Sequence, residues 1–535
     1  MPTSQFARAS AGLVIAVSMA LLAPLGVSGA SAEVDSVPSL EQTIAAEQAL
    51  EVAQEVMTGT STQLSPSMAL RELAVRQSDL AGADQRAAEV LLTRPHGGAT
   101  GRDIPAAVWT GSEAAKSVSG GGCSSTVPVC VHWTNQGDDA PPSADANSNQ
   151  VPDWVEKSVT VMETVWDYEI NTLGYRAPLT DERASIDNDG VNFDVYLSDI
   201  GTRGYYGYCT VDDSRTKPAS NYQYGDFATY CVLDNDFARD EFPTNSPREN
   251  LEVTAAHEFF HAVQFAYDAL EDAWFMEGSA AWIEDEVYDS VNDNRQYLSS
   301  SQFRKPTVPL DASRGLGVYG TWGFLRYLSE RFGTDVIREA WERADYSPGG
   351  PDDYSIQALD RVISRETSFD DVMGDFGLVI NRPRAFLSEG KAFPTATEDR
   401  FLLGRAGATT GWQSYTLDHM SYAPVDVRPG GSVRAGARLK VIIDAPGRPT
   451  APEARVMVVR KNGSVGAIKA VALNRKGNGS TSVPFAPGSV QRVVVALGNT
   501  STDFRRCYSG TTSFSCGGGV PLHDNARHWF KAIVR

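Results

Sequence analysis

The sequence predicts an α+β protein with a helical N-terminal region, a mixed domain whose sheet-bearing half precedes a helical half, and a C-terminal all-β sandwich. In the middle of the chain strand-like runs precede helical patterns, and short β-branched runs between Gly, Pro and Asn clusters follow Gly390. The 535 residues, 42% of them hydrophobic, can fill several packed cores. Charge divides the chain as well: residues 401–535 carry 18 basic and 6 acidic side chains, and residues 1–400 carry 29 and 61.

The first 32 residues have the features of a secretory signal peptide. Arg8 precedes an apolar run over residues 11–27, and Ala30-Ser31-Ala32 forms a small-residue cleavage pattern. Pro24 disfavours a membrane-spanning helix, and no later stretch reaches the ~18 apolar residues that such a helix needs. The sequence therefore predicts a secreted protein without a transmembrane anchor.

Residues 33–102 are rich in Ala, Glu, Gln and Leu, and the apolar side chains of Leu40, Ile44, Leu50 and Val56 follow a loosely helical spacing. Two interpretations stay open: a helical N-terminal domain, or a propeptide removed after secretion, as the position directly behind a signal peptide suggests. The region contains no cysteine, so an inhibitory propeptide would have to act through a side chain other than a thiol.

The six cysteines of the chain occur as three sequence-near pairs. Their spacings do not match the common zinc knuckles, and a local turn can close each short loop. We therefore expect three disulfides, Cys123–Cys130, Cys209–Cys231 and Cys507–Cys516. Disulfides of this kind indicate an oxidising, extracellular compartment.

Residues 103–390 form the predicted mixed domain, and residues 391–535 form the predicted basic β-sandwich accessory domain. Strand-like runs come first, at Val127–Thr134, Phe193–Ser198 and Ala228–Leu233. Helical patterns follow at Pro247–Ala269, Trp274–Tyr288, Tyr319–Phe332, Asp335–Ala344 and Tyr354–Ser364. Strands of the accessory domain are predicted at Leu439–Ile443, Arg455–Arg460, Arg492–Leu497 and Trp529–Val534. We expect a cleft where the two halves of the mixed domain meet.

One predicted helix carries a metal-binding motif. The Ser246–Glu249 stretch has the residues of a capping box, which predicts a helix start. His257 and His261 lie four residues apart on the same helix face, where both imidazoles can bind one Zn²⁺ ion. Glu258 follows the first histidine and can reach the water at the open coordination position.

A zinc site on this motif needs a third protein ligand. The metzincin pattern is excluded, because Gln264 and Tyr267 stand where it requires Gly and His. A carboxylate on the following helix is the other route, and Glu277 is the candidate, with small Gly278 expected to let the two helices approach. Glu284, two turns further along the same face, is the second candidate, and the sequence leaves the choice open.

Together, His257-Glu258-x-x-His261 and Glu277-Gly-x-Ala resemble the signature of gluzincin metallopeptidases in the peptidase-MA-like superfamily. The layout is similar to that of a group of secreted bacterial metalloproteases with a C-terminal β module. The close match covers residues 245–290, and the spacer to Glu277 is shorter than in the thermolysin-like branch. The resemblance implies a two-part zincin domain and a zinc endopeptidase with His257, His261 and Glu277 as ligands and Glu258 as general base.

Peptide hydrolysis at such a centre also needs a hydrogen-bond donor for the oxyanion. Tyr319 opens a predicted helix in the helical half and is the candidate. A core or cleft-lining tyrosine is an equal alternative, since Tyr327 and Trp322 offer similar chemistry.

A second metal motif lies upstream of the histidine helix. Oxygen donors occupy calcium-loop positions 1, 3, 5, 7, 9 and 12, at Asp145, Asn147, Asn149, the Val151 carbonyl, Asp153 and Glu156. Gln150 departs from the pattern, because this position normally holds Gly for a sharp turn. The sequence predicts a structural Ca²⁺ loop, and a polar Asn/Asp turn without metal is the alternative.

The formal net charge of −20 argues against nucleic-acid binding by the whole chain. The leading hypothesis is a secreted zinc endopeptidase acting on proteins or peptides. The alternative is an inert, zinc-stabilised peptidase fold that attaches to cell-surface polymers, because the net charge of +12 on residues 401–535 could hold an anionic cell-wall polymer.

Overall fold

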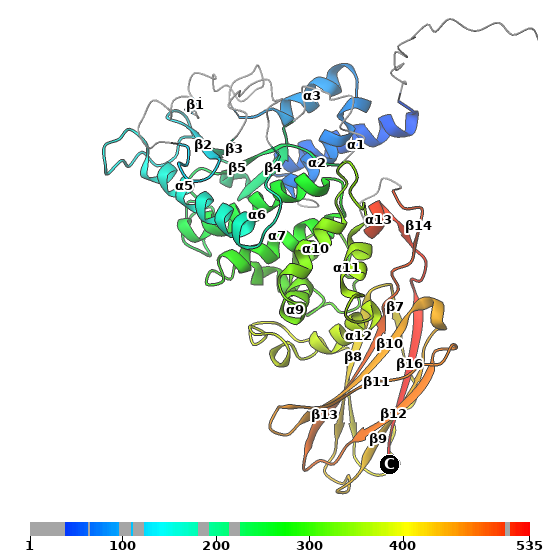
Figure 1. Cartoon of the computed structure of the whole chain (residues 1–535). Coiled ribbons are helices and arrows are strands. Elements are labelled where there is room, and N and C mark those ends of the chain that lie inside the picture. The colour runs from blue at the N-terminus through cyan, green and yellow to red at the C-terminus, as the bar shows by residue number, and fades with distance from the viewer. Residues whose placement is uncertain are drawn as a thin grey trace, which may run out of the picture. The chain divides into compact units, whose positions relative to one another are not determined.

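The chain consists of N-terminal helices, a sheet-bearing region, a helical middle and C-terminal sheets, in this order (Figure 1). This confirms the mixed α+β organisation expected from the sequence. The computed structural model describes residues 38–61, 65–95, 109–110, 122–179, 192–212, 225–508 and 514–535, and residues 40–535 form one compact unit. The predicted signal peptide at residues 1–32 lies outside the described residues. Within these ranges, no helix combines the length and apolar character needed to cross a bilayer.

Three helices form the N-terminal region: α1 (Leu40–Met57), α2 (Pro66–Arg76) and α3 (Gly82–Leu92). Ser65 caps α2, because its hydroxyl accepts a hydrogen bond from the Met68 amide at 3.1 Å, and Pro66 fits the first turn. Apolar side chains of α2 join the main hydrophobic core, and the helix packs against strand β4 (Gly207–Val211). The region is helical, as expected, and it contacts the domain that follows.

The first sheet has five strands in the order β1-β2-β3-β5-β4. Besides β4, the bounds are β1 Trp109–Thr110, β2 Val129–Thr134, β3 Phe193–Ser198 and β5 Thr229–Asp234. β2, β3 and β5 are parallel to one another and match the predicted strands to within two residues, whereas β1 and β4 are antiparallel edge strands. The sequence pattern does not predict β4, a five-residue strand that begins with Gly207, because glycine is disfavoured in strands.

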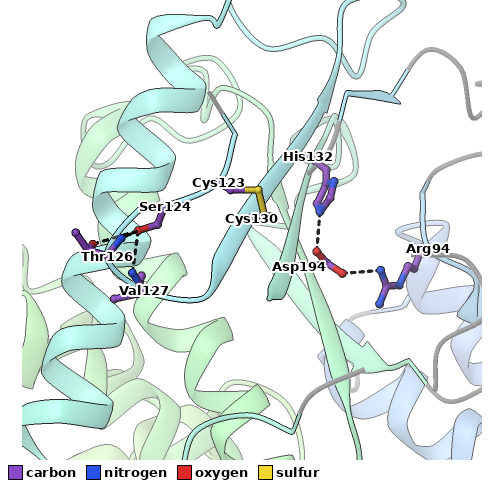
Figure 2. Close-up of a disulfide and its surroundings, with 8 residues drawn as sticks. All are labelled: Arg94, Cys123, Ser124, Thr126, Val127, Cys130, His132 and Asp194. Atoms are coloured by element: carbon purple, nitrogen blue, oxygen red, sulfur yellow. Dashed lines mark hydrogen bonds and ion pairs between the residues drawn. A yellow bond between two sulfur atoms is a disulfide. The ribbon is translucent and has the colours of Figure 1, made fainter. Parts of the chain in front are cut away.

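Disulfides join the three predicted cysteine pairs. Cys123–Cys130 lies next to the start of β2 (Figure 2), and Cys209 in β4 lies directly opposite Cys231 in β5. Cys507–Cys516 closes a short loop in the C-terminal region. The pairing inferred from nearest neighbours is confirmed, so these thiols are not available as zinc ligands.

Helix α5 lies between β2 and β3 in the chain. The helical middle follows β5 and contains seven α-helices. The bounds of these helices are α5 Asp153–Trp166, α6 Pro247–Asp268, α7 Ala273–Val287, α8 Gly317–Gly320, α9 Trp322–Phe332, α10 Asp335–Arg343, α11 Ser355–Ile363 and α12 Phe369–Val379. The capping box predicted at Ser246 and Glu249 is present at the start of α6. The helix predicted from Tyr319 to Phe332 is divided at Thr321 into α8 and α9. The pattern misses α12, in which Gly374 and Gly377 weaken the helical signal.

The C-terminal region contains a five-stranded sheet of order β11-β10-β13-β8-β6 and a four-stranded sheet of order β12-β9-β16-β7. Buried side chains of both sheets, among them Val425, Val441, Val495 and Phe530, form one hydrophobic core. The bounds are β6 Asp399–Leu403, β7 Gln413–Leu417, β8 Ser421–Pro429, β9 Arg438–Asp444, β10 Pro452–Arg460, β11 Val465–Ala470, β12 Asn478–Pro484, β13 Val490–Asn499 and β16 Ala526–Val534, with β14 Phe504–Arg505 and β15 Val520–Pro521 paired separately.

The C-terminal sheets meet the helical middle at α12. Leu378 of α12 packs with Met457 of β10 and Val494 of β13. Beside this apolar contact, the buried guanidinium of Arg455 pairs with Asp371 at 2.7 Å and Asp375 at 3.0 Å. One basic side chain of the C-terminal region therefore serves to bind the acidic helical part.

Candidate metal centre

Two packed helices, α6 and α7, carry the predicted zinc ligands. His257 and His261 lie one turn apart on α6, and Glu277 lies in the first half of α7. All three side chains are buried, with 8%, 0% and 1% of their residue surfaces exposed. Burial on this scale separates the three side chains from bulk water, so their polar atoms need partners within the protein or a metal ion.

The three side chains converge on one point. The Glu277 Oε2 atom lies 3.3 Å from the Nε2 atom of His257 and 3.7 Å from the Nε2 atom of His261. Among the described residues, buried Nε2 of His261 and buried Oε2 of Glu277 have no hydrogen-bond partner. Because buried polar atoms are rarely left unpaired, these atoms fit a shared metal ion.

Two further groups in the described ranges also bring three ligand atoms to within 4.8 Å of one another, namely Asp234, Asp236 and Glu241, and Asp285, Asp289 and Glu389. Both consist of carboxylates alone, whereas structural and catalytic zinc sites draw on imidazole or thiolate ligands. The histidine group is therefore the candidate zinc centre.

Each histidine is oriented by a hydrogen bond at its other ring nitrogen. Nδ1 of His257 pairs with Glu284 Oε1 at 2.6 Å, and Nδ1 of His261 pairs with Gln264 Oε1 at 2.7 Å. The Gln264 amide in turn donates to the Met276 carbonyl at 2.9 Å. Such partners fix the ring and leave Nε2 for the metal, so Glu284 lies behind His257 rather than beside the convergence point.

Gly278, expected to let α7 approach the histidine helix, faces a different neighbour. A Cβ atom at this position would collide with Thr321 and would lie 3.6 Å from Leu325 Cδ1. The small residue therefore serves the packing of α7 against α8 and α9. The expectation about its role was wrong, because periodicity alone does not tell which side of a buried helix meets which partner.

The buried charges explain the protonation of the ligands. Burial would lower the pKa of His257, but the adjacent carboxylates of Glu277 and Glu284 outweigh this and raise the pKa well above its usual range. Burial would raise the pKa of Glu277, but the imidazoles of His261 and His257 lower the pKa below its usual range. Burial raises the pKa of Glu284 to about 7. Zinc would compete with the His257 proton, since a ligating imidazole must be neutral.

Glu258, the predicted base, lines a cavity that the three zinc-ligand candidates also line. Burial raises the pKa of its carboxyl group, the direction that a general base at neutral pH needs. A Cβ atom at Gly207 of β4 would come within 2.8 Å of Glu258 Cγ, so glycine is required for this strand to pass beside the base. The sequence alone gave no reason to assign Gly207 to the site.

Tyr319 lines this cavity, which has a volume of about 270 Å³ and also contains the zinc-ligand candidates and Glu258. Its ring centre is 6.0 Å from that of His257, and its ring stacks on Tyr297 at 4.8 Å. Burial raises the pKa of Tyr319 well above its usual range, so the hydroxyl remains a hydrogen-bond donor. Tyr327 and Trp322, the alternatives, are not among the lining residues.

Two serines that sequence reasoning did not single out touch the centre. Ser65 donates a hydrogen bond to Glu277 Oε1, and Ser67 donates one to Glu258 Oε2 at 3.1 Å. Both lie at the start of α2, some 190 residues or more before their partners. No local pattern marks them, because only the tertiary contact gives them a role.

The predicted calcium loop folds around its own side chains. Both Asn147 and Asn149 donate amide hydrogen bonds to Glu156, the latter at 2.8 Å. The Asp145 carboxylate accepts the backbone amides of Asn149 and Gln150, and Asp153 accepts that of Ala146. Gln150 takes the positive φ of 69° that glycine normally supplies in such loops. Val151 is buried, and calcium binding by this loop stays a prediction.

Comparison with known proteins adds no relative: no family model matches the sequence, and no curated protein matches it.

Proposed function

We propose that this protein is a secreted zinc-dependent endopeptidase of the gluzincin type. The convergence of His257 Nε2, His261 Nε2 and Glu277 Oε2 on one buried point, next to a cavity that contains Glu258, supports this proposal. A binding protein without activity has no need for a base beside its metal ligands. The three disulfides and the signal-like first 32 residues support secretion.

In this proposal His257, His261 and Glu277 hold the ion, and Glu284 and Gln264 orient the two imidazoles. Zinc, when bound, would polarise the scissile carbonyl and lower the pKa of water toward ~7. Glu258 accepts the proton of the attacking water and returns it to the leaving nitrogen. Tyr319 lines the same cavity and donates a hydrogen bond from its hydroxyl group to the developing oxyanion.

The substitution Glu258→Gln tests the proposed reaction. It keeps the shape of the side chain but removes the base, so we expect casein hydrolysis by the secreted protein to fall about 10²–10⁴-fold. The zinc content should stay at that of the wild type, because Glu258 is not a proposed ligand. Hydrolysis is followed by release of acid-soluble peptides, and zinc is measured by atomic emission.

Glu252→Gln is the matched control, because Glu252 lies on the same helix and pairs with the exposed Arg248. This variant should cleave casein at the wild-type rate. A wild-type protein that carries one zinc yet cleaves neither casein nor a varied peptide library would contradict the proposal.

A further inference from the structure

The cavity of the candidate metal centre is lined in part by the chain's own N-terminal region. Ser65, Pro66 and Met68 from the start of α2 lie among its lining residues. They face Glu258 and Glu277, which belong to the domain some 200 residues further along the chain. Residues 65–68 therefore fill this part of the cleft.

Ser65 contacts the proposed third ligand and lines the cavity that also contains the proposed oxyanion donor. Its hydroxyl donates to Glu277 Oε1, while Glu277 Oε2 faces the two histidines, so the contact is compatible with a metal held by Oε2. Ser65 and Tyr319 also line the same cavity. A substrate carbonyl would have to approach both Tyr319 and the metal, in the cavity that Ser65 lines.

Ser67 contacts the base. Its hydroxyl donates to Glu258 Oε2 at 3.1 Å and accepts the Cys209 amide of β4 at 3.0 Å. Ser67 is 1% exposed and Glu258 is 7% exposed. The serine hydroxyl thus occupies a position from which the attacking water would give its proton to Glu258.

Contacts beyond the cleft hold α2 in place. The buried Arg71 guanidinium donates to the Glu271 carbonyl, which precedes α7, at 2.8 Å. At the end of α1, Arg203 donates to the Met57 carbonyl at 3.2 Å. After α3, the guanidinium of Arg94 pairs at 2.5 Å with Asp194 of β3, whose other oxygen binds His132 of β2 at 2.7 Å (Figure 2). Buried ion pairs of this kind are costly to break, so the N-terminal region is firmly docked.

We propose that residues 65–68 are an internal inhibitor of the zinc centre. The hydroxyls of Ser65 and Ser67 form hydrogen bonds with Glu277 and Glu258 and keep substrate away until α2 is displaced. This inference rests on the proposed peptidase function, because only an active enzyme can be kept latent. The occlusion of the metal centre by residues 65–68 does not itself depend on catalysis. It assigns the N-terminal helices the role of an inhibitory propeptide that acts through hydroxyl groups rather than through a thiol.

The experiment compares the full-length secreted chain with variants that loosen the segment. Arg71→Glu places a carboxylate against the Glu271 carbonyl and should undock α2. The double substitution Ser65→Ala and Ser67→Ala removes the two hydroxyls, including the cap of α2, but keeps the Arg71 contact that docks this helix. Arg86→Glu is the matched control, since Arg86 is an exposed arginine on α3. Circular dichroism verifies that each variant is folded.

Two rates are measured for each protein: zinc loss to dipicolinate, read with a metal-sensitive dye, and cleavage of a quenched peptide library. If the open state holds about a tenth of the wild-type population, Arg71→Glu speeds both rates about tenfold. The double serine variant should speed them about two- to fivefold, since only part of the contact is lost. Arg86→Glu should leave both rates unchanged.

The outcomes separate the two proposals. Equal zinc-loss rates in the wild type, Arg71→Glu and the double serine variant would overturn the internal inhibitor, whether or not peptides are cleaved. Faster zinc loss without cleavage by any variant would support the inhibitor and reject the peptidase function. Should Arg71→Glu fail to fold, the double serine variant alone decides, because Ser→Ala changes rarely unfold a protein of this size.

Discussion

The histidine centre and the Asp145–Glu156 loop are both predicted from ligand spacing, yet their ligand atoms differ in whether they have hydrogen-bond partners within the protein. In the centre, His261 Nε2 and Glu277 Oε2 are buried and lack hydrogen-bond partners within the part of the chain that the structure describes. In the loop, the carboxylate of Glu156 accepts two asparagine amides. The centre therefore leaves ligand atoms free for an ion, while the loop satisfies its own donors and acceptors.

The difference teaches what converts a ligand motif into a binding site. A site gains affinity when its ligands are held together and have no better partner within the protein. Packing of α6 on α7 achieves this for the histidines, since both rings are fixed at Nδ1. The loop must exchange internal hydrogen bonds for metal contacts, so its affinity for an ion should be weaker.

The largest expected effect comes from removing a ligand of the buried centre. His261→Ala should abolish zinc retention and casein hydrolysis together, because two remaining ligands cannot hold the ion. Zinc content after dialysis and hydrolysis rates measure this. A variant that keeps one tightly bound zinc would place the ion elsewhere and remove the contrast between the two regions.

Tyr319→Phe tests whether the cavity supplies more than metal ligands. Loss of an oxyanion donor should lower kcat about 10²–10³-fold while zinc content and KM change little. Steady-state kinetics on a peptide substrate measure the effect, and Tyr327→Phe, at a tyrosine that does not line the cavity, is the control. An unchanged kcat would leave Tyr319 as a lining residue only.

Glu284→Gln should give a smaller effect and settles the choice between the two candidate ligands. If Glu284 only orients His257, zinc affinity should fall about 10–100-fold and activity should return at high zinc. Affinity is measured by competition with a chelator of known strength. Complete loss of binding, equal to that of Glu277→Gln, would mean that Glu284 is itself a ligand.

The smallest effect is expected at the loop. Extracellular sites bind Ca²⁺ with Kd values of about 10⁻⁴–10⁻³ M, so 1 mM Ca²⁺ should raise the free energy of unfolding by on the order of 1 kcal/mol. Thermal melts with Ca²⁺ and with a chelator measure this gain, and Glu156→Gln should remove it. Asp138→Asn, at an exposed nearby aspartate, should leave the gain unchanged. No response in the wild type would favour the plain Asn/Asp turn.

The loop and the centre also show which features of the structure can be predicted from the sequence. The spacing of His257 and His261 predicts both the helix and the shared face, because a four-residue step is one helical turn. Nearest-neighbour cysteines predict the three disulfides, and continuous apolar runs predict three of the five strands in the first sheet. These features depend on residues that are close in the sequence.

Contacts between distant residues could be predicted only in part. Whether Glu277 or Glu284 faces the Nε2 atoms of the histidines depends on the rotation of α7 against α6, which the periodicity of a helix buried along most of its length does not encode. Ser65 and Ser67 give no signal, since serine before a helix reads as a cap, and Ser65 is indeed the cap of α2.

The sequence by itself determined the local chemistry of this protein: two imidazoles on one helix face, a carboxylate between them, the disulfide pairs and the order of helical and β regions. Tertiary structure alone decided which distant groups join that chemistry. It brings Glu277 to the histidines, Gly207 beside the base and α2 over the cleft, because the packing of whole elements, rather than any short pattern, sets the distance between residues 200 positions apart.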